Sequence, residues 1–562
     1  MMKYLLGCIC SLLLMLPSGL NAQGSVEERP PVTRAFFLNN AFVVQSPGKV
    51  IDLGGVLIRD GLIQAVGKDL KAPADAKVLE ADSMYIYAGF IDGLSNLGVP
   101  KPKEEASSNR NRGNQREYNP SYERAGIQTE RSVVDQLSPT DKSLSEMRAI
   151  GFTAAHVVPR GGMLPGQGAV ILLDGKKAGK MVVSEGSSLF AQFKGASGVY
   201  PSTDMAIMSK FRELYQQARQ HKAHAGNYAK SARGMSRPAQ NDVLTAFGQS
   251  IDGKRPIFFA VDGIKEMYRA ISLSKELGFP LALADVTMGD KAIAPLKASG
   301  ASIFLTLDLP KVPKKDDKKD DKEEETDKEK VKLEEQRAAA MKMYEEQATM
   351  LTKAGLPFGF STLSTKAKDV RANLGRMIKA GLTEDQALAA LTTEPARILG
   401  LSDVMGTIEK GKIANLVVTD QPYFAEGSNV RYVFVDGMPS EYEVKKKKKK
   451  KEPGDPDVKV VAAGSWSLEI DVPMAQMQSP TLTITNDDGS LSGTLVSGMG
   501  TSEISDMTLD GDSLVFSFSA GEGGQNVTVT FELTIDGDSL EGTMAAGEFG
   551  SFDVEGDRDP EN

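Results

Sequence analysis

The chain has 562 residues, of which 41% are hydrophobic and 25% are charged, a length and composition typical of about two to four domains with buried cores. The formal net charge of −9 is mildly acidic and gives no support for nucleic-acid binding, which calls for a clustered basic surface. Both cysteines, Cys8 and Cys10, lie near the start, so the rest of the chain offers neither a disulfide nor a thiolate zinc site.

Residues 1–22 have the pattern of a secretory signal peptide. Lys3 supplies a positive charge, residues 5–16 are apolar, and Leu20-Asn21-Ala22 resembles a cleavage site. The apolar run is too short to span a bilayer. Leu5-Leu6-Gly7-Cys8 is similar to a lipid-attachment sequence, but the apolar region follows it instead of preceding it. We therefore expect an exported, periplasmic or extracellular protein with no transmembrane segment after signal removal.

Short β-type runs begin the next region and return near residue 406. Asp60-Gly61 lies between two apolar runs, which is a hairpin signal. A similar pattern of short β-type runs occupies residues 406–418. These features predict a composite β-sandwich domain built from residues 33–88 and 401–442.

Between these two flanks, residues 89–400 alternate short apolar runs with amphipathic ones. The predicted strands lie at 153–158, 256–261, 281–284, 301–305 and 356–361, and the predicted helices at 204–222, 264–277 and 383–391. The alternation predicts an α/β domain of parallel βα units, and its length suits a TIM-like (β/α)8 barrel. A doubly wound open sheet is the main alternative, but no Gly-x-Gly-x-x-Gly follows a strand.

Two charge-dense stretches interrupt this plan. Residues 311–335 are rich in Lys, Asp and Glu, which predicts a solvated insertion in the barrel domain. Residues 443–457 contain the lysine run 445–451 and predict an exposed linker, which could also contact anionic lipid or polysaccharide.

Residues 458–557 change character and consist of short alternating runs separated by Asp-Gly turns. The phrase Gly-Asp-Ser-Leu occurs at 511–514 and again at 537–540. Such regular turns predict a separate all-β barrel or sandwich. Gly464-Ser465-Trp466 is similar to the start of lipocalin-like and avidin-like barrels, and we expect the only tryptophan to lie in the core.

Four stretches carry a resemblance to a known family: residues 85–96 (Tyr-Ile-Tyr-Ala-Gly-Phe-Ile-Asp-Gly-Leu-Ser-Asn), the Gly-Phe-Thr-Ala-Ala-His-Val-Val-Pro-Arg-Gly-Gly run at 151–162, the helical run 380–400 and the return at 406–418. With these motifs, residues 33–440 resemble the amidohydrolase superfamily, specifically its imidazolonepropionase-like and dihydroorotase-like branches. The resemblance implies a barrel that hydrolyses carbon–nitrogen bonds other than peptide bonds with one or two divalent metals.

The same resemblance implies that the metal site is degenerate. The family places His-x-His after strand 1, Lys or Glu after strand 4, His after strands 5 and 6, and Asp after strand 8. The corresponding positions here are Leu94, Asn96, Ala260 and Leu363, and no histidine follows the sixth strand. We therefore assign no metal ligand and no confident catalytic residue, and we expect no cofactor.

The chain has three histidines, and none is placed as a family ligand. His156 lies in a predicted strand and is interpreted as a core or supporting histidine. His221 and His224 share one face of a polar predicted helix, which favours a solvated surface.

Oxygen ligands leave a second possibility open. The candidate barrel-mouth residues are Asp92, Asp262, Asp285, Asp308, Ser361, Thr362 and Ser364. The mouth is the usual functional face of this fold, and such carboxylates could bind zinc, magnesium or another divalent ion, or a cationic ligand; they could also serve only as caps and solvated groups.

Three functional hypotheses follow. The first is an exported, catalytically degenerate protein that keeps the barrel as a binding or scaffolding subunit, as a homodimer or paired with an active amidohydrolase. The second is an active hydrolase of linear or cyclic amides with a carboxylate-held metal. The third is a small-ligand or carbohydrate binder that acts through the C-terminal β domain.

Overall fold

The structure is a computed structural model that describes residues 34–101, 119–196, 198–287, 291, 293–311, 327–442, 462–470, 479–487, 490–498, 500–520, 527–546 and 551–559. The predicted signal peptide, the lysine-rich linker and residues 312–326 of the charged insertion lie outside the described residues. The chain divides into two compact units, residues 1–445 and 446–562, and each is described by itself.

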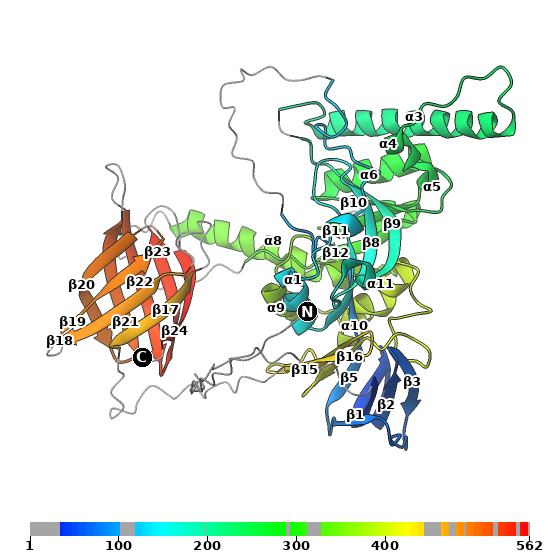
Figure 1. Ribbon diagram of the computed structural model, residues 1–562. Coiled ribbons are helices and arrows are strands. Elements are labelled where there is room, and N and C mark those ends of the chain that lie inside the picture. The colour runs from blue at the N-terminus through cyan, green and yellow to red at the C-terminus, as the bar shows by residue number, and fades with distance from the viewer. Residues whose placement is uncertain are drawn as a thin grey trace, which may run out of the picture. The chain divides into compact units, whose positions relative to one another are not determined.

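One eight-stranded sheet joins the two flanks of the first unit (Figure 1). Its strands are β1 (Ala35–Ser46), β2 (Lys49–Arg59), β3 (Leu62–Gly67), β4 (Lys77–Glu80), β5 (Tyr85–Ala88), β14 (Leu416–Thr419), β15 (Val430–Val435) and β16 (Met438–Glu441). The order is β16-β15-β14-β5-β1-β2-β3, with β4 on β1. Strands β14 and β5 pair antiparallel, with Val418 opposite Ile86. The predicted turn joins β2 to β3, where Asp60 and Gly61 both have positive φ, as a two-residue hairpin turn requires.

The barrel is a ring of eight strands. They are β6 (Phe90–Ser95), β7 (Phe152–Val157), β8 (Gly166–Leu172), β9 (Val182–Gln192), β10 (Ile257–Ala260), β11 (Leu281–Val286), β12 (Ser302–Thr306) and β13 (Gly359–Ser361). The last strand returns beside the first, where the Thr362 N–H donates to the Leu94 carbonyl at 3.2 Å. The predicted fold class, a TIM-like α/β barrel with a composite β domain and a C-terminal β-barrel, is confirmed.

One strand departs from the expected parallel arrangement. Strand β8 runs antiparallel to both β7 and β9. The segment from 158 to 165 that joins β7 to β8 is shorter than the dozen or so residues that a parallel crossover needs. This part of the barrel is therefore built from strands that follow each other directly.

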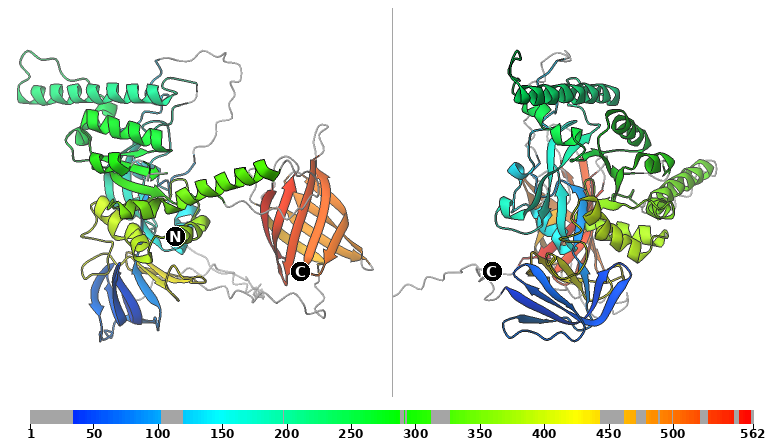
Figure 2. Two further views of the ribbon diagram at one scale, coloured as in Figure 1. Left: turned by 180° about the vertical axis from the view of Figure 1, so that it is seen from behind. Right: turned by 90° about the vertical axis from the view of Figure 1, so that its right-hand side faces the viewer.

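Helices cover the outside of the barrel (Figure 2). They are α1 (Lys142–Ala149), α2 (Ala178–Met181), α3 (Asp204–Lys230), α4 (Asp242–Thr245), α5 (Gly248–Ile251), α6 (Ile264–Leu277), α7 (Ile293–Ser299), α8 (Asp327–Lys353), α9 (Ala367–Lys379), α10 (Glu384–Leu391) and α11 (Thr393–Ile398), with a 3-10 turn at Val134–Gln136. Helix α6 buries Met267, Ala270 and Leu273, which recur at helical spacing, and ends at Gly278 in the left-handed conformation. None of the helices in the described part of the chain combines the length and apolarity that a membrane span needs.

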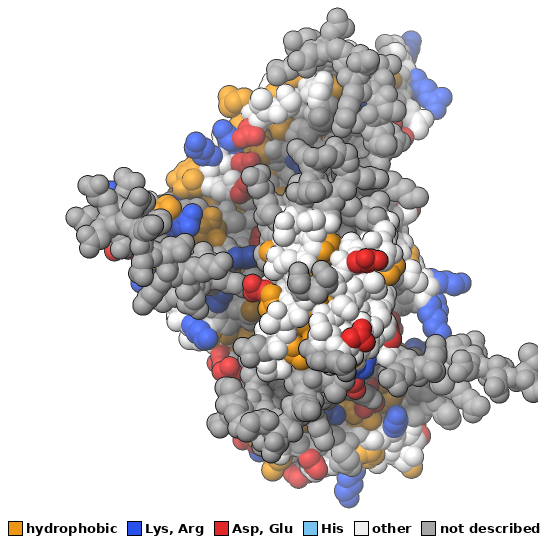
Figure 3. All heavy atoms as spheres, turned by 90° about the vertical axis from the view of Figure 1, so that its left-hand side faces the viewer, with side chains coloured by type: hydrophobic (Ala, Val, Ile, Leu, Met, Phe, Trp, Pro, Cys, Tyr) orange, Lys and Arg blue, Asp and Glu red, His pale blue; other side chains and the backbone are white. Residues whose placement is uncertain are grey.

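The second unit is a closed antiparallel barrel. Its strands are β17 (Gly464–Ile470), β18 (Thr481–Asp487), β19 (Ser490–Ser497), β20 (Gly500–Asp510), β21 (Ser513–Ala520), β22 (Val527–Asp536), β23 (Ser539–Ala546) and β24 (Ser551–Arg558). Alternate residues point inward, so that Trp466, Phe516 and Phe531 lie in one hydrophobic core. Figure 3 shows one face of the molecule, on which acidic, basic and hydrophobic side chains stand singly or in small groups among neutral atoms.

Trp466 is fully buried at the start of β17. Its indole N–H donates to the Ala462 carbonyl at 3.0 Å, and the Arg558 guanidinium lies 4.2 Å from its ring centroid. Since it is the only tryptophan, its fluorescence reports on the second unit, whereas every helix of the described residues lies in the first.

We predict that Gly93→Ala destabilises the first unit by at least about 3 kcal/mol, because overpacking here meets both a ring and the backbone. A Cβ at Gly93 would lie 2.0 Å from Cδ1 of Phe304 and 2.7 Å from the Phe360 carbonyl oxygen. Denaturation followed by the circular dichroism of the helices measures the loss.

Gly375→Ala is the matched control, because a Cβ there meets nothing within 4 Å and the residue lies inside α9. It should stabilise the unit by up to about 1 kcal/mol. Equal stability of the Gly93→Ala variant and the unchanged protein would contradict this account of the barrel interior.

Candidate functional site

An apolar layer fills the interior of the barrel. It consists of Leu94, Val158, Phe190, Phe258, Ala282, Ala284 and Phe304, all buried, with Ala260 and Leu363 packed against them. The Phe258 and Phe304 rings stack at 5.8 Å, and Phe304 also lies against Gly93 and Gly359. Leu94 is thus part of a hydrocarbon core at the position where the resemblance implied a metal-binding histidine.

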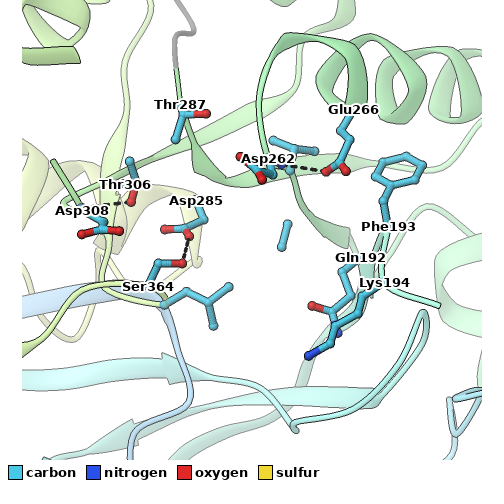
Figure 4. A pocket seen from close by; sticks show the side chains of 13 residues that line it. Gln192, Phe193, Lys194, Asp262, Glu266, Asp285, Thr287, Thr306, Asp308 and Ser364 are labelled. Carbon is cyan, nitrogen blue, oxygen red and sulfur yellow. Dashed lines mark hydrogen bonds between the residues drawn. The ribbon is translucent and has the colours of Figure 1, made fainter. Parts of the chain in front are cut away.

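A pocket of about 460 Å³ lies above this layer, at the carboxyl ends of the parallel strands (Figure 4). Side chains alternate along a strand, so the residue two positions beyond each phenylalanine again faces inward. Gln192, Ala260 and Thr306 follow Phe190, Phe258 and Phe304 in this way, and all three line the pocket. The pocket therefore occupies the usual functional face of the fold.

Asp285 is turned toward the pocket by an irregularity in β11. Its φ of 54° is left-handed, and the pairing of β11 with β12 shifts register between Leu283 and Val286. Such bulges re-aim side chains, and aspartate tolerates this conformation better than most residues. The Ser361 hydroxyl donates to Oδ1 at 3.1 Å, and the Ser364 hydroxyl donates to Oδ2.

Two further carboxylates converge from neighbouring strands. Asp308 follows β12, and its backbone N–H donates to the Thr306 hydroxyl oxygen at 3.0 Å. Asp262 follows β10, and its N–H donates to the Glu266 carboxylate at 2.7 Å. Asp262, Asp285, Asp308 and Ser364 thus line the pocket as predicted candidates, and Glu266 joins them.

No cation contributes to the pKa shifts of Asp285 and Asp308. Burial raises the pKa of Asp285, an effect that hydrogen bonds from Ser364, Thr306 and Ser361 partly offset and that the charge of Asp308 adds to. Burial also raises the pKa of Asp308, to which the charge of Asp369 adds. No Lys or Arg is among the causes of either shift; hydroxyl groups compensate the charge of Asp285, whereas Asp308 is exposed to solvent.

The opposite wall was not predicted. Gln192, Phe193 and Lys194, at the end of β9, lie across the pocket from Asp285 and Asp308 in Figure 4. The Gln192 amide donates to the carbonyls of Gly161 and Gly162, each at 2.8 Å. Sequence reasoning assigned no strand here, because the polar residues in Val182–Gln192 hide its alternation.

Asp92, Ser361 and Thr362 lie beneath the pocket instead of lining it. Asp92 is fully buried and accepts from the Thr362 N–H at 3.1 Å and the Leu94 N–H at 3.3 Å; it also pairs with the Thr362 hydroxyl. Burial raises the pKa of Asp92 to about 7, although these hydrogen bonds oppose the shift. Asp92 therefore joins β6 to the end of β13.

The side chains of Asn96 and of the three histidines also contact neighbouring protein groups. The Asn96 amide donates to the Val158 carbonyl at 2.7 Å. His156 is fully buried, contacts Gly93 O at 3.1 Å and Ser188 Oγ at 2.8 Å, and burial lowers its pKa to about 4. His221 and His224 lie on α3 and contact the carbonyls of Ala239 and Ser236.

The donor set does not fit the metal centre of the superfamily. Apolar Leu94, Ala260 and Leu363 stand at three of the implied ligand positions, and the fourth, Asn96, is engaged with the backbone. Within the described residues, no group of three or more His, Cys, Asp or Glu side chains is arranged to hold a metal ion. We therefore derive no chemical step through a metal.

Comparison with known proteins finds similarity to amidohydrolases in part of the sequence and in the fold. Residues 286–439 match the model of the amidohydrolase family. The chain is 34% identical over 102 residues to the imidazolonepropionase of Flavobacterium johnsoniae, a match that covers 16% of this chain. The chain spans only 25% of the length of that curated relative.

A solved amidohydrolase from Thermotoga maritima has a similar fold, with a TM-score of 0.58 and 20% identity over 72% of this chain and 99% of that one. At this identity the likeness concerns the fold alone. Residues 286–439 match the amidohydrolase family by sequence, and the fold around them is similar to that of a solved amidohydrolase.

We predict that the free energy of unfolding of the first unit falls as pH rises from about 4 to about 7. The folded protein keeps the Asp92 proton up to about pH 7, whereas the unfolded chain releases it near the ordinary pKa of 3.8. The unfolded state then binds fewer protons, so the contribution of Asp92 is complete below pH 4 and is lost as pH passes 7. Each tenfold difference in proton affinity between the two states corresponds to about 1.4 kcal/mol, so the loss amounts to a few kcal/mol.

Asp92→Asn should flatten this slope, because an amide oxygen can still accept from Thr362 while nothing titrates. Thr362→Val should instead move the loss to higher pH, because it removes a hydrogen bond that favours the ionised carboxylate. Denaturation at several pH values, followed by helical circular dichroism, distinguishes the variants. An unchanged slope in Asp92→Asn would assign the pH dependence to other groups.

Proposed function

We propose that this protein is a catalytically degenerate member of the amidohydrolase superfamily that binds a small molecule in the barrel-mouth pocket without a metal. The observation that carries this proposal is the burial of Leu94 among Phe258 and Phe304, which fills the interior with hydrocarbon. The cavity of about 460 Å³ above that layer has the size of ordinary ligand pockets.

The chemistry of the lining supports binding over amide hydrolysis. A metal lowers the pKa of bound water to about 7 and polarises the scissile carbonyl. The pocket instead offers carboxyl groups whose pKa is raised by burial, and these supply no Lewis acid. Water beside Asp285 and Asp308 therefore lacks the activation that a bound metal gives it.

We also propose that the protein is exported and that it pairs with a second subunit. The signal-like residues 1–22 favour a periplasmic or extracellular location. A barrel that binds without turnover would be useful as the non-catalytic partner of an active amidohydrolase, or as a homodimer. Coexpression with an amidohydrolase encoded nearby would test the pairing.

We predict that purified protein takes up no stoichiometric zinc, manganese or cobalt and hydrolyses no member of a panel of linear and cyclic amides. The reason is the absence of nitrogen ligands at Leu94 and Ala260. Isothermal titration with each metal, together with amide turnover in its presence, measures both properties.

The rival, a hydrolase with a carboxylate-held metal, makes the opposite prediction. It requires uptake of one ion per chain and turnover, both abolished by Asp285→Asn and Asp308→Asn. Asp403→Asn serves as the control, because Asp403 is exposed and lies outside the pocket lining. That pattern of results would replace our proposal.

The third hypothesis, ligand binding by the C-terminal barrel, has no specific observation in its favour. Trp466, Phe516 and Phe531 contribute to a core that fills the interior of this barrel. A ligand would have to use the outer wall.

A further inference from the structure

The charge around the pocket is unbalanced. Among the described residues, four carboxyl side chains, from Asp262, Glu266, Asp285 and Asp308, line it against one cation, Lys194. Lys194 is exposed and lies across the pocket from Asp285 and Asp308 in Figure 4. Carboxyl groups therefore outnumber cations around a cavity that is open to a ligand.

Apolar side chains line the same cavity. Phe193, Val261 and Leu363 contribute an aromatic ring and two aliphatic groups, and Ala260 forms part of the floor. Ligand pockets commonly combine such walls with a few placed polar groups. A cation that carries a hydrocarbon body would bury its apolar part here and could also present its charge to the Phe193 ring.

On these grounds we propose that the pocket binds a small organic cation, an ammonium or guanidinium group on an apolar body, anchored by Asp285 and Asp308. This inference rests on the proposed binding function and specifies its ligand. The cavity, the uncompensated carboxylates and the apolar wall point to the same class, which an anion or a neutral sugar would match less well.

The arrangement of oxygens favours an organic cation over a metal ion. Calcium and magnesium need about six or more oxygen ligands converging at about 2.0–2.6 Å. Both oxygens of Asp285 already accept hydroxyl hydrogen bonds, from Ser361 and Ser364. An ammonium group donates up to three hydrogen bonds at about 2.7–3.2 Å, so it tolerates acceptors that are spread around a cavity.

The test is isothermal titration of the full-length protein with three probes of one shape: benzylammonium, benzyl alcohol and benzoate. We expect benzylammonium to bind at least about tenfold more tightly than the neutral and anionic probes, since each factor of ten corresponds to about 1.4 kcal/mol. Asp308→Asn and Asp285→Asn should each weaken benzylammonium binding by about tenfold or more, because each removes one charge-assisted contact.

Two controls make the result specific. Asp403→Asn removes an exposed carboxylate outside the pocket and should leave the affinity unchanged. Asparagine accepts left-handed backbone, so Asp285→Asn should keep the fold; helical circular dichroism checks this.

The outcomes separate the ligand class from the binding function. Equal or tighter binding of benzyl alcohol or benzoate overturns the cationic ligand and leaves a binding pocket. Binding of magnesium or calcium that displaces benzylammonium overturns it in favour of a metal site. Binding of none of the three probes overturns the ligand class, and failure of a broad small-molecule screen as well would overturn the proposed function.

Discussion

The packing of Phe304 against two glycines determines much of the first unit. The Phe304 side chain occupies the space that a side chain at Gly93 or Gly359 would fill. Strands β6 and β13 can therefore approach each other and close the barrel. Together with Phe258 and Leu94 it makes the barrel interior a hydrocarbon core. Such a core stabilises through burial and tight packing, and it leaves no room for the imidazoles that a metal centre needs.

Two carboxyl groups hold the segment that caps this core. Asp92 binds Thr362 from below, and Asp285 binds Ser361 and Ser364 from the pocket side. Asp92 is fully buried and Asp285 is half-buried, and no cation is among the causes of either pKa shift, a costly arrangement that hydrogen bonds only partly offset. The wall that carries Leu363 and Ser364 is thereby anchored to the fold, which keeps the pocket shape defined.

The sequence was sufficient for the fold because the strongest patterns are periodic. Helix α6 occupies the predicted residues 264–277, and β10 to β12 lie within two residues of their predicted bounds. The chain direction of β8 could not be predicted, because period-two alternation is the same in both directions. Helix α3 runs eight residues beyond its predicted end, since Ala223, Ala225 and Ala229 favour the helix and a single glycine, Gly226, does not end it.

The site was only partly predictable. Asp262 and Asp308 come two residues after the ends of their strands and line the pocket, because parallel strands end on one face. Asp92 lies within β6 and points into the core, since the direction of a side chain depends on a register that one strand alone does not define. Lys194 and Glu266 carry no motif, and their role depends on elements far apart in the chain.

The free-energy cost of placing carboxylates in the pocket supports a ligand-binding role. Asp285 and Asp308 have raised pKa values because burial disfavours their charge, and Asp285 adds a left-handed backbone. Neutral or apolar side chains at these positions would remove the desolvation cost and extend the core that already fills the layer below. Strained and electrostatically unfavourable residues cluster where a protein meets a ligand, since a bound partner supplies the missing compensation. An amine or guanidinium seated beside Asp285 would do so here, whereas a barrel kept only as a scaffold would need none of these charges.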